Sequence, residues 1–143
     1  MRISTKGRYS LEALLYMALL PEDRYTSAQV IAEGTDISGG YLEQLFIPLR
    51  RAGIVQGIRG PQGGYRPGRD LEAITVGDIL RAVEGVLEPV PCVASETCSM
   101  AETCLSRHTW AELYREINDC ADSITLADLA ASYQALDQAE YTI

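Results

Sequence analysis

Apolar residues recur three and four positions apart over residues 5–20, the spacing of a helix with one buried face. Thr5 can cap this helix and Pro21 stops it. A capping box at residues 26–29 predicts a second, shorter helix that ends before Gly34. The expected buried stripe of the first helix comprises Leu11, Leu14, Leu15, Ala18 and Leu19. Both helices belong to the core of a protein that we expect to be mainly α-helical.

A third helix follows after a short turn, and Ser38 can cap it. Its apolar face is formed by Leu42, Leu45 and Phe46. The side chains turned toward solvent or a ligand are Tyr41, Glu43 and Gln44. Because proline lacks a backbone donor and clashes with the preceding turn, Pro48 predicts that the helix ends near Phe46 or Ile47. Two helices joined by a tight turn predict a helix-turn-helix whose second helix is the recognition helix.

The pattern then changes to that of a β-hairpin. A β-branched run begins at Ile54 and leads to a glycine-rich tip at residues 60–64. No Gly-Lys-Ser/Thr follows this tip, so a nucleotide-phosphate loop is rejected. The candidate DNA contacts of this wing and of the turn before it are Arg50, Arg51, Arg59 and Gly60. The alternative is that these arginines are surface residues without a ligand.

Two further helices are predicted in the second half, with a long apolar seam between them. One helix runs from Thr75 to Gly85, and the last runs from Thr125 to about Leu136. The seam residues, again three and four apart, are Trp110, Leu113, Ile117, Cys120 and Ile124. Such a seam can pack on its own domain or on a second copy, and we favour a homodimer, with Cys120 as a small buried hydrophobe.

These elements predict a mainly α fold, a winged helix-turn-helix with a small β-hairpin wing and a long C-terminal dimerisation helix. Residues 1–85 would form the DNA-binding domain, residues 86–104 a cysteine loop, and residues 105–143 the dimerisation helix and C-terminal helix.

The charge of the chain is divided between its halves. The net charge of −8 argues at first against DNA, since phosphates are neutralised by Lys and Arg. However, residues 1–69 hold nine Lys/Arg and six Asp/Glu, whereas residues 70–143 hold three and fourteen. A basic first half beside an acidic second half is typical of a DNA-binding module joined to a sensing or dimerising module.

Other classes are disfavoured. The longest apolar run, residues 11–20, contains Glu12 and falls short of the roughly 20 residues that span a bilayer, so no membrane contact is expected. Without an apolar signal core near the start, we expect a cytoplasmic protein, in which structural disulfides among the four cysteines are not expected. The single histidine has no supported catalytic partner, and we predict no enzyme.

Three cysteines, Cys92, Cys98 and Cys104, are separated by five residues each. Structural zinc sites use closer pairs, so zinc is a weaker candidate than an iron-sulfur cluster held by three thiolates and a fourth ligand. His108, four residues after Cys104 and about one helical turn along the same face, is the nearest fourth ligand. From the residues alone, a cluster, a thiol switch and incidental loop cysteines all remain open.

The chain resembles, over nearly its whole length, the winged-helix regulator family that includes the iron-sulfur regulator IscR, the nitric-oxide-sensing NsrR and the cysteine-metabolism repressor CymR. Besides the cysteine loop, the segments that carry the resemblance are residues 1–9 (MRISTKGRY), 41–45 (YLEQL), 49–53 (LRRAG), 59–61 (RGP) and 63–65 (GGY). The resemblance implies a homodimer that crosses on the long helix and binds a palindromic operator in double-stranded DNA. Arg59 would enter the minor groove and Lys6 would meet phosphate. The residues implied to read the major groove are Ser38, Tyr41, Glu43 and Gln44.

In the IscR-like branch the three cysteines bind a 2Fe-2S cluster, with a histidine three residues after the last of them. Here that position holds Arg107, and histidine comes one residue later at His108, about 100° further around a helix. The NsrR-like branch uses an acidic residue of the first helix, where this chain has Arg8; Glu12 is a distant substitute. The CymR-like branch lacks the cysteines and responds through a protein partner.

The leading hypothesis is therefore a dimeric transcription regulator that senses an iron-sulfur cluster or redox state through Cys92, Cys98 and Cys104. The alternative is a CymR-like regulator of cysteine or sulfur metabolism with a protein partner, or a thiol or zinc sensor without a cluster. A small redox protein is a distant third.

Overall fold

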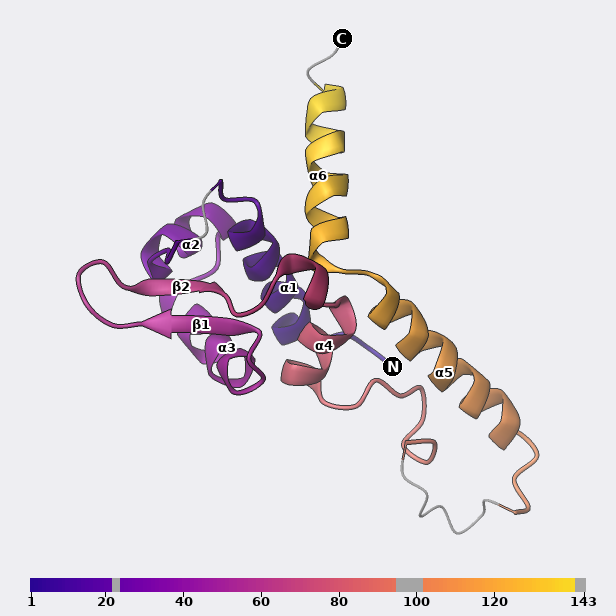
Figure 1. Ribbon diagram of the computed structural model, residues 1–143. Helices are drawn as coiled ribbons and strands as arrows, with labels where there is room; N and C mark the ends of the chain where they lie inside the picture. Colours follow the sequence, from indigo (N-terminus) through magenta and orange to yellow (C-terminus); the bar gives the residue numbers. More distant parts are fainter. Residues whose placement is uncertain (22–23, 95–101, 141–143) are drawn as a thin grey trace.

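Three helices pack together at the N-terminal end of the chain: α1 (Thr5–Ala18), α2 (Ala28–Thr35) and α3 (Gly39–Arg51). The computed structural model describes residues 1–21, 24–94 and 102–140 (Figure 1). Leu14, Ile31 and Phe46, one from each of these helices, are among the largest fully buried side chains, so all three helices contribute to one core. The fold is the predicted one, mainly helical with a two-stranded hairpin.

The second helix begins and ends later than predicted. Ser27, and not the expected capping box at residues 26–29, caps it by accepting from the N–H of Val30 at 3.2 Å. Gly34 lies inside α2, and the turn is made instead by Asp36, whose φ of 60° places it in the left-handed region. A Cβ at Gly34 would lie 2.3 Å from ring atoms of Tyr16 on α1. The glycine therefore serves the close approach of two helices and not the end of one.

The prediction that Pro48 ends the third helix is wrong, because α3 continues to Arg51. The backbone N–H of Ala52 donates to the carbonyl of Pro48 at 3.1 Å, so helical bonding resumes after the proline. Proline removes the bond to the residue four positions back, which is the exposed Gln44, where water can replace the lost donor. Leu45, Phe46 and Leu49 are buried on both sides of Pro48 and hold the helix in place.

The wing is an antiparallel hairpin of β1 (Val55–Ile58) and β2 (Gly64–Pro67), in which Val55 pairs with Pro67 and Ile58 with Gly64. Thr26, just before α2, adds one more rung to this sheet. It exchanges two backbone hydrogen bonds of 2.8 Å with Tyr65. These bonds fasten the wing to the segment before α2.

The remaining elements are a 3-10 turn η1 (Leu71–Ala73), α4 (Val76–Glu84), α5 (Arg107–Ser123) and α6 (Leu126–Glu140). Thr75 and Thr125 cap α4 and α6 through capping boxes, as predicted, and α6 extends past the predicted end at Leu136. The two capped turns form a bridge, because the N–H of Val76 donates to Ile124 at 2.9 Å. Helices α5 and α6 project from the N-terminal body in different directions (Figure 1).

The seam of α5 is only partly covered by its own chain. Trp110 and Ile117 are half-buried, but Leu113 is 42% exposed. Cys120, which we expected to be buried, is exposed, because α5 packs on α4 with only part of its surface. None of the helices in the described part of the chain is both long and apolar enough to cross a membrane.

Candidate nucleic-acid interface

Helix α3 presents one face to the core and the opposite face to solvent. Its buried side chains are Leu42, Leu45, Phe46 and Leu49. Glu43 and Gln44 are exposed, and Ile47 beside them is 46% exposed. The predicted ligand-facing side chains therefore stand on an open ridge, which is the shape that a major groove admits.

Ser38 and Tyr41 form the first turn of this ridge. The hydroxyl oxygen of Ser38 accepts a hydrogen bond from the backbone N–H of Tyr41 at 3.2 Å, which caps the helix without using the hydroxyl proton. Tyr41 is half-buried, and its ring meets Tyr9 of α1 edge to face, with centroids 5.8 Å apart. Tyr9 was not among the predicted site residues, although this contact holds Tyr41 at the boundary between core and ridge.

Arg50 and Arg51 lie in the last turn of α3, and both are exposed. A Cβ at Gly57 would be 3.4 Å from the guanidinium carbon of Arg50, so this side chain lies over β1 of the wing. Positive charge at the C-terminal end of a helix also interacts favourably with the helix dipole. Both arginines therefore have a structural role that does not depend on DNA.

Arg59 and Gly60 begin the tip of the wing, and both are exposed. The N–H of Gly63 donates to the carbonyl of Gly60 at 2.9 Å, and Gly60 has a φ of 115° that favours glycine. The tip is thus a closed turn with an arginine at its edge, well suited to a narrow groove of negative potential.

Arg66 on β2 was not predicted as part of this region. Its Nε–H donates to the side-chain oxygen of Gln56 at 3.1 Å, and its guanidinium lies 4.6 Å from the ring centroid of Tyr25. These contacts tie the two strands of the wing to the segment before α2. They depend on the strand register, which the amino-acid pattern alone did not specify.

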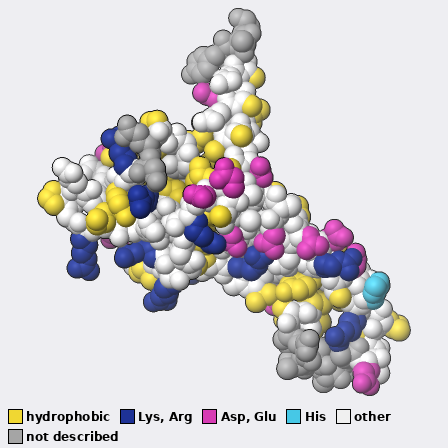
Figure 2. Space-filling view, in the orientation of Figure 1, with side chains coloured by type: hydrophobic (Ala, Val, Ile, Leu, Met, Phe, Trp, Pro, Cys, Tyr) yellow, Lys and Arg dark blue, Asp and Glu magenta, His cyan; other side chains and the backbone are white. Residues whose placement is uncertain are grey.

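The charges separate over the surface as the sequence predicted. In the view of Figure 2, Asp and Glu side chains form a band from the centre of the molecule along α5. The charged side chains on the part of that face over the wing and α3 are mainly Lys and Arg. The basic region therefore coincides with the ridge and the wing, where phosphates would be met.

Lys6 lies in the first turn of α1 and is exposed. Ser4, the residue that precedes this helix, makes no side-chain cap to the helix backbone. Instead, a carboxylate oxygen of Glu84 accepts from the backbone N–H of Ser4 at 2.9 Å and from that of Gly7 at 3.0 Å. Glu84 was missed by the sequence reasoning, because no local pattern indicates a contact between residues about 80 positions apart.

The cysteine region is described at both of its ends, whereas Cys98 lies outside the described residues. Cys92 and Cys104 are free thiols of intermediate exposure. The hydroxyl of Ser106, 3.5 Å from the sulfur, lowers the pKa of the Cys104 thiol, and nearby backbone N–H groups and Arg107 act in the same direction. A lowered pKa favours the thiolate, which is the form that binds metals and reacts.

The expected geometry of Cys104 and His108 is wrong. Helix α5 begins at Arg107, so Cys104 lies before the helix and does not share a helical face with His108. His108 is exposed, and Ser106 connects Cys104 instead to Trp110, whose indole N–H donates to the Ser106 hydroxyl at 2.9 Å. Among the described residues, which exclude Cys98, no three His, Cys, Asp or Glu side chains are grouped as a metal site.

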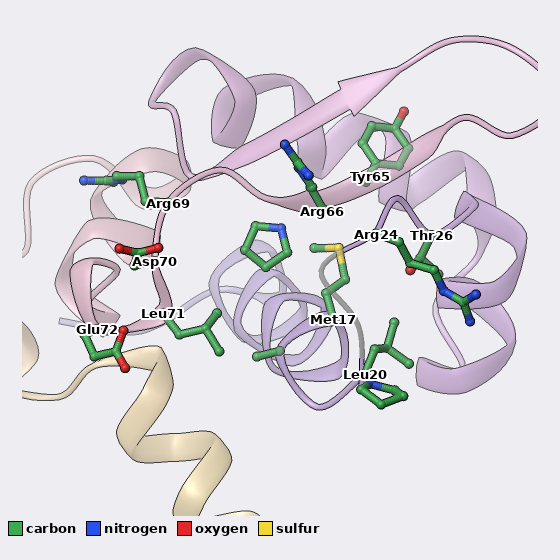
Figure 3. A pocket seen from close by; sticks show the side chains of 13 residues that line it. Met17, Leu20, Arg24, Thr26, Tyr65, Arg66, Arg69, Asp70, Leu71 and Glu72 are labelled. Carbon is green, nitrogen blue, oxygen red and sulfur yellow. The ribbon is translucent and has the colours of Figure 1, made fainter.

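A hollow of ≈ 330 Å³ lies elsewhere, between the end of α1, β2 and η1 (Figure 3). Met17, Leu20 and Leu71 give it an apolar floor, while Arg69 and Asp70 stand at one end. None of the residues that line it was predicted to contact DNA or a cluster.

Comparison with known proteins places the chain in one family. The family model Rrf2, described as an iron-dependent transcriptional regulator, matches residues 3–132. The HTH-type transcriptional regulator IscR of Yersinia enterocolitica is 39% identical over 140 residues, which cover 98% of this chain and 85% of the relative.

Two solved structures are also similar. That of CymR, the global cysteine regulator of B. subtilis, has a TM-score of 0.75 and 41% identity, covering 92% of this chain and 98% of CymR. That of T. potens IscR has a TM-score of 0.74 and 35% identity, covering 93% of this chain and 88% of the other. The similarity in sequence and in structure spans both the helix-turn-helix and the C-terminal helices, and the chain belongs to the Rrf2 family of winged-helix transcriptional regulators.

Proposed function

We propose that this transcription regulator binds a palindromic operator as a homodimer and changes its DNA binding with the state of a 2Fe-2S cluster on its cysteine loop. The observation that supports the DNA part most directly is the open ridge of α3, where Glu43 and Gln44 are exposed beside a basic wing. No catalytic role is needed, since the family consists of regulators and not enzymes.

The DNA contacts are proposed residue by residue. Glu43 and Gln44, with Ser38 and Tyr41 at the start of α3, would read base edges in the major groove. Arg59 and the Gly60 backbone would enter the adjacent minor groove from the wing. The cations that would contact phosphates are Lys6, Arg50 and Arg51.

The homodimer is proposed from the apolar surface that the single chain leaves open. Leu113 on α5 is 42% exposed, and on α6 Tyr133 and Leu136 are 52% and 69% exposed. Large apolar side chains in neighbouring turns favour a protein interface. In this arrangement residues 1–85 bind DNA, residues 86–104 hold the cluster and residues 105–143 join the two copies.

The donor chemistry of the loop fits an iron-sulfur cluster. Cys92, Cys98 and Cys104 would supply thiolates, and the hydroxyl of Ser106 favours the thiolate of Cys104 by lowering its pKa. His108 is the candidate fourth ligand and would have to turn toward the loop from its exposed position at the start of α5. When bound, a 2Fe-2S cluster supplies a one-electron redox centre that oxidants and iron supply can change.

The cluster is tested by anaerobic purification followed by absorption spectroscopy and iron and sulfide analysis. We expect a coloured protein with two iron and two sulfide per chain, and loss of both in Cys104→Ser. Cys120→Ser is the matched control, because Cys120 is an exposed cysteine on α5 away from the loop. A colourless, iron-free wild-type protein after reconstitution would rule the cluster out.

A second candidate is a CymR-like sensor in which the thiols act without a cluster. The TM-score of 0.75 to B. subtilis CymR supports it, and the lowered pKa of Cys104 suits a reactive thiol as well as a cluster ligand. Its partner would then be a protein of cysteine metabolism, and a reducing cytoplasm would keep the thiols free. Metal-free protein whose operator affinity changes on oxidation, with zinc also absent, would support this candidate over the cluster.

A further inference from the structure

The N-terminal turn of α1 is capped by a residue from the opposite end of the DNA-binding part. One carboxylate oxygen of Glu84 accepts hydrogen bonds from the backbone N–H of Ser4 at 2.9 Å, the N–H of Gly7 at 3.0 Å, and the hydroxyl of Ser4. Hydrogen bonds to an ionised acceptor are stronger than neutral ones, and an acid at a helix N-terminus is also favoured by the dipole. Glu84 therefore acts as the N-terminal cap that Ser4 does not supply.

Gly7 makes this contact possible. A Cβ at Gly7 would lie 2.6 Å from the Glu84 oxygen and 2.8 Å from the side chain of Ile3. Gly7 is buried, so the turn and the carboxylate are in close contact with no space for a larger residue. The fit brings α1 and the end of α4 into close contact at this point.

Lys6 lies between the two backbone groups that Glu84 binds. The backbone on both sides of it is therefore held by hydrogen bonds to Glu84, from Ser4 before it and from Gly7 after it. The side chain itself is exposed, and Arg2 and Arg8 line a shallow hollow at the same turn. A basic turn fixed at both sides is oriented before any ligand arrives, which reduces the entropy lost on binding.

Glu84 is also the last residue of α4, and the chain leaves it through Gly85, whose φ is 85°. The segment that follows leads directly to Cys92. We propose that Glu84 is a positioning residue that orients Lys6 toward a DNA phosphate and couples this contact to the end of α4, where the cysteine loop begins. The inference rests on the proposed phosphate contact of Lys6.

The test is a double-mutant cycle with Lys6→Ala, Glu84→Ala and the double variant, all in the full-length, metal-free, reduced protein. Binding is measured by fluorescence anisotropy, over a range of salt concentrations, on a DNA duplex selected by this protein from a random-sequence pool. Glu84→Gln keeps an acceptor oxygen but removes the charge. Glu88→Ala removes the same charge four residues further along and is the matched control.

We expect Lys6→Ala to weaken binding and to reduce the slope of log K against log salt by about 1. Glu84→Ala should lose the same factor and the same slope, and the double variant should lose no more than either single variant. Glu84→Gln should show a smaller loss that also disappears in the Lys6→Ala background, which provides the cycle if Glu84→Ala does not fold. Glu88→Ala should bind as the wild type does.

Additive losses would overturn the proposal, because Glu84 would then act independently of Lys6. Tighter binding by both Glu84→Ala and Glu84→Gln would also overturn it, since the carboxylate would merely repel DNA. If Lys6→Ala binds normally while the wild type selects a specific duplex, the inference fails and the proposed function stands. A wild-type protein that selects no duplex, whether metal-free or carrying the cluster, would refute the proposed function itself.

Discussion

Ser38 can separate the stability of the recognition helix from its contact with DNA. Its hydroxyl caps α3 by accepting from the N–H of Tyr41 at 3.2 Å, and the residue is exposed. Ser38→Ala removes this acceptor, which costs about 1 kcal/mol of unfolding free energy. For a chain of this size, that lowers the melting temperature by roughly 3–5 °C.

Ser38→Asp should behave differently, because aspartate caps a helix as well as serine does. The melting temperature is then expected to stay at or near the wild-type value. The new carboxylate would stand where Ser38 is proposed to meet DNA, so operator affinity should fall by tenfold or more, about 1.4 kcal/mol. Ser38→Ala therefore lowers mainly the stability, whereas Ser38→Asp lowers mainly the affinity for DNA.

The melting temperature is measured by thermal unfolding at one fixed protein concentration. The operator affinity is measured by fluorescence anisotropy with an operator duplex. Thr125→Ala is the control, because it removes an equivalent cap from α6, where Thr125 accepts from the N–H of Asp128 at 3.0 Å. It should lower the melting temperature as Ser38→Ala does and leave the intrinsic DNA contacts unchanged. Wild-type affinity in Ser38→Asp would refute the DNA role, and an unchanged melting temperature in Ser38→Ala would refute the cap.

Gln44→Ala should cost about 1–3 kcal/mol of binding free energy at one base position of the operator. Arg59→Ala should instead weaken binding to every operator with the same wing site. Competition with single-base operator variants distinguishes the two, and a uniform loss in Gln44→Ala would contradict a base contact. Because the Ser106 hydroxyl lowers the pKa of Cys104, its thiolate persists to lower pH than that of an ordinary thiol. Ser106→Ala should therefore move the pH midpoint of Cys104 alkylation, mapped by mass spectrometry, to higher pH. An unmoved midpoint would contradict this cause. Ile117→Glu, at a half-buried position of the α5 seam, should give monomers in analytical ultracentrifugation, and a persistent dimer would exclude the seam as the interface.

Three helix starts were predictable because their capping interactions are local, whereas the caps predicted at Thr5 and at residues 26–29 are wrong, since Ser4 precedes α1 and Ser27 caps α2. Ser38, Thr75 and Thr125 each bond a backbone group three residues ahead, and this spacing is visible in the sequence. The family resemblance added the expected roles of the wing and of the recognition helix, and the match to the Rrf2 model over residues 3–132 confirmed the family. Local chemistry and family pattern together gave the winged helix-turn-helix.

Other errors came from positions whose role depends on a distant partner. Glycine is typical of a helix end, but at Gly34 the position that a Cβ would occupy is filled by the ring of Tyr16 from another helix. Pro48 is a helix breaker in isolation, yet the burial of Phe46 and Leu49 holds α3 through it. The contact of Glu84 with the start of α1 spans about 80 positions of the chain and has no local signature. Tertiary packing decided each of these cases.

The cysteine region is connected to the DNA-binding part through a few contacts between α4, α5 and the segment that follows α4. In the described structure, the Asn118 side chain donates to the carbonyl of Leu87 at 2.9 Å, and Asp122 forms an ion pair with Arg81 of α4. Leu87 is only 2% exposed and lies between the end of α4 and Cys92. In the proposed sensing, a change at Cys92 would reach α4 along the chain past Leu87, and a change at Cys104 would reach it along α5 to Asn118. Both routes would meet at the hydrogen bond between Asn118 and Leu87. Leu87 lies three residues beyond Glu84, and Glu84 holds the basic turn of α1.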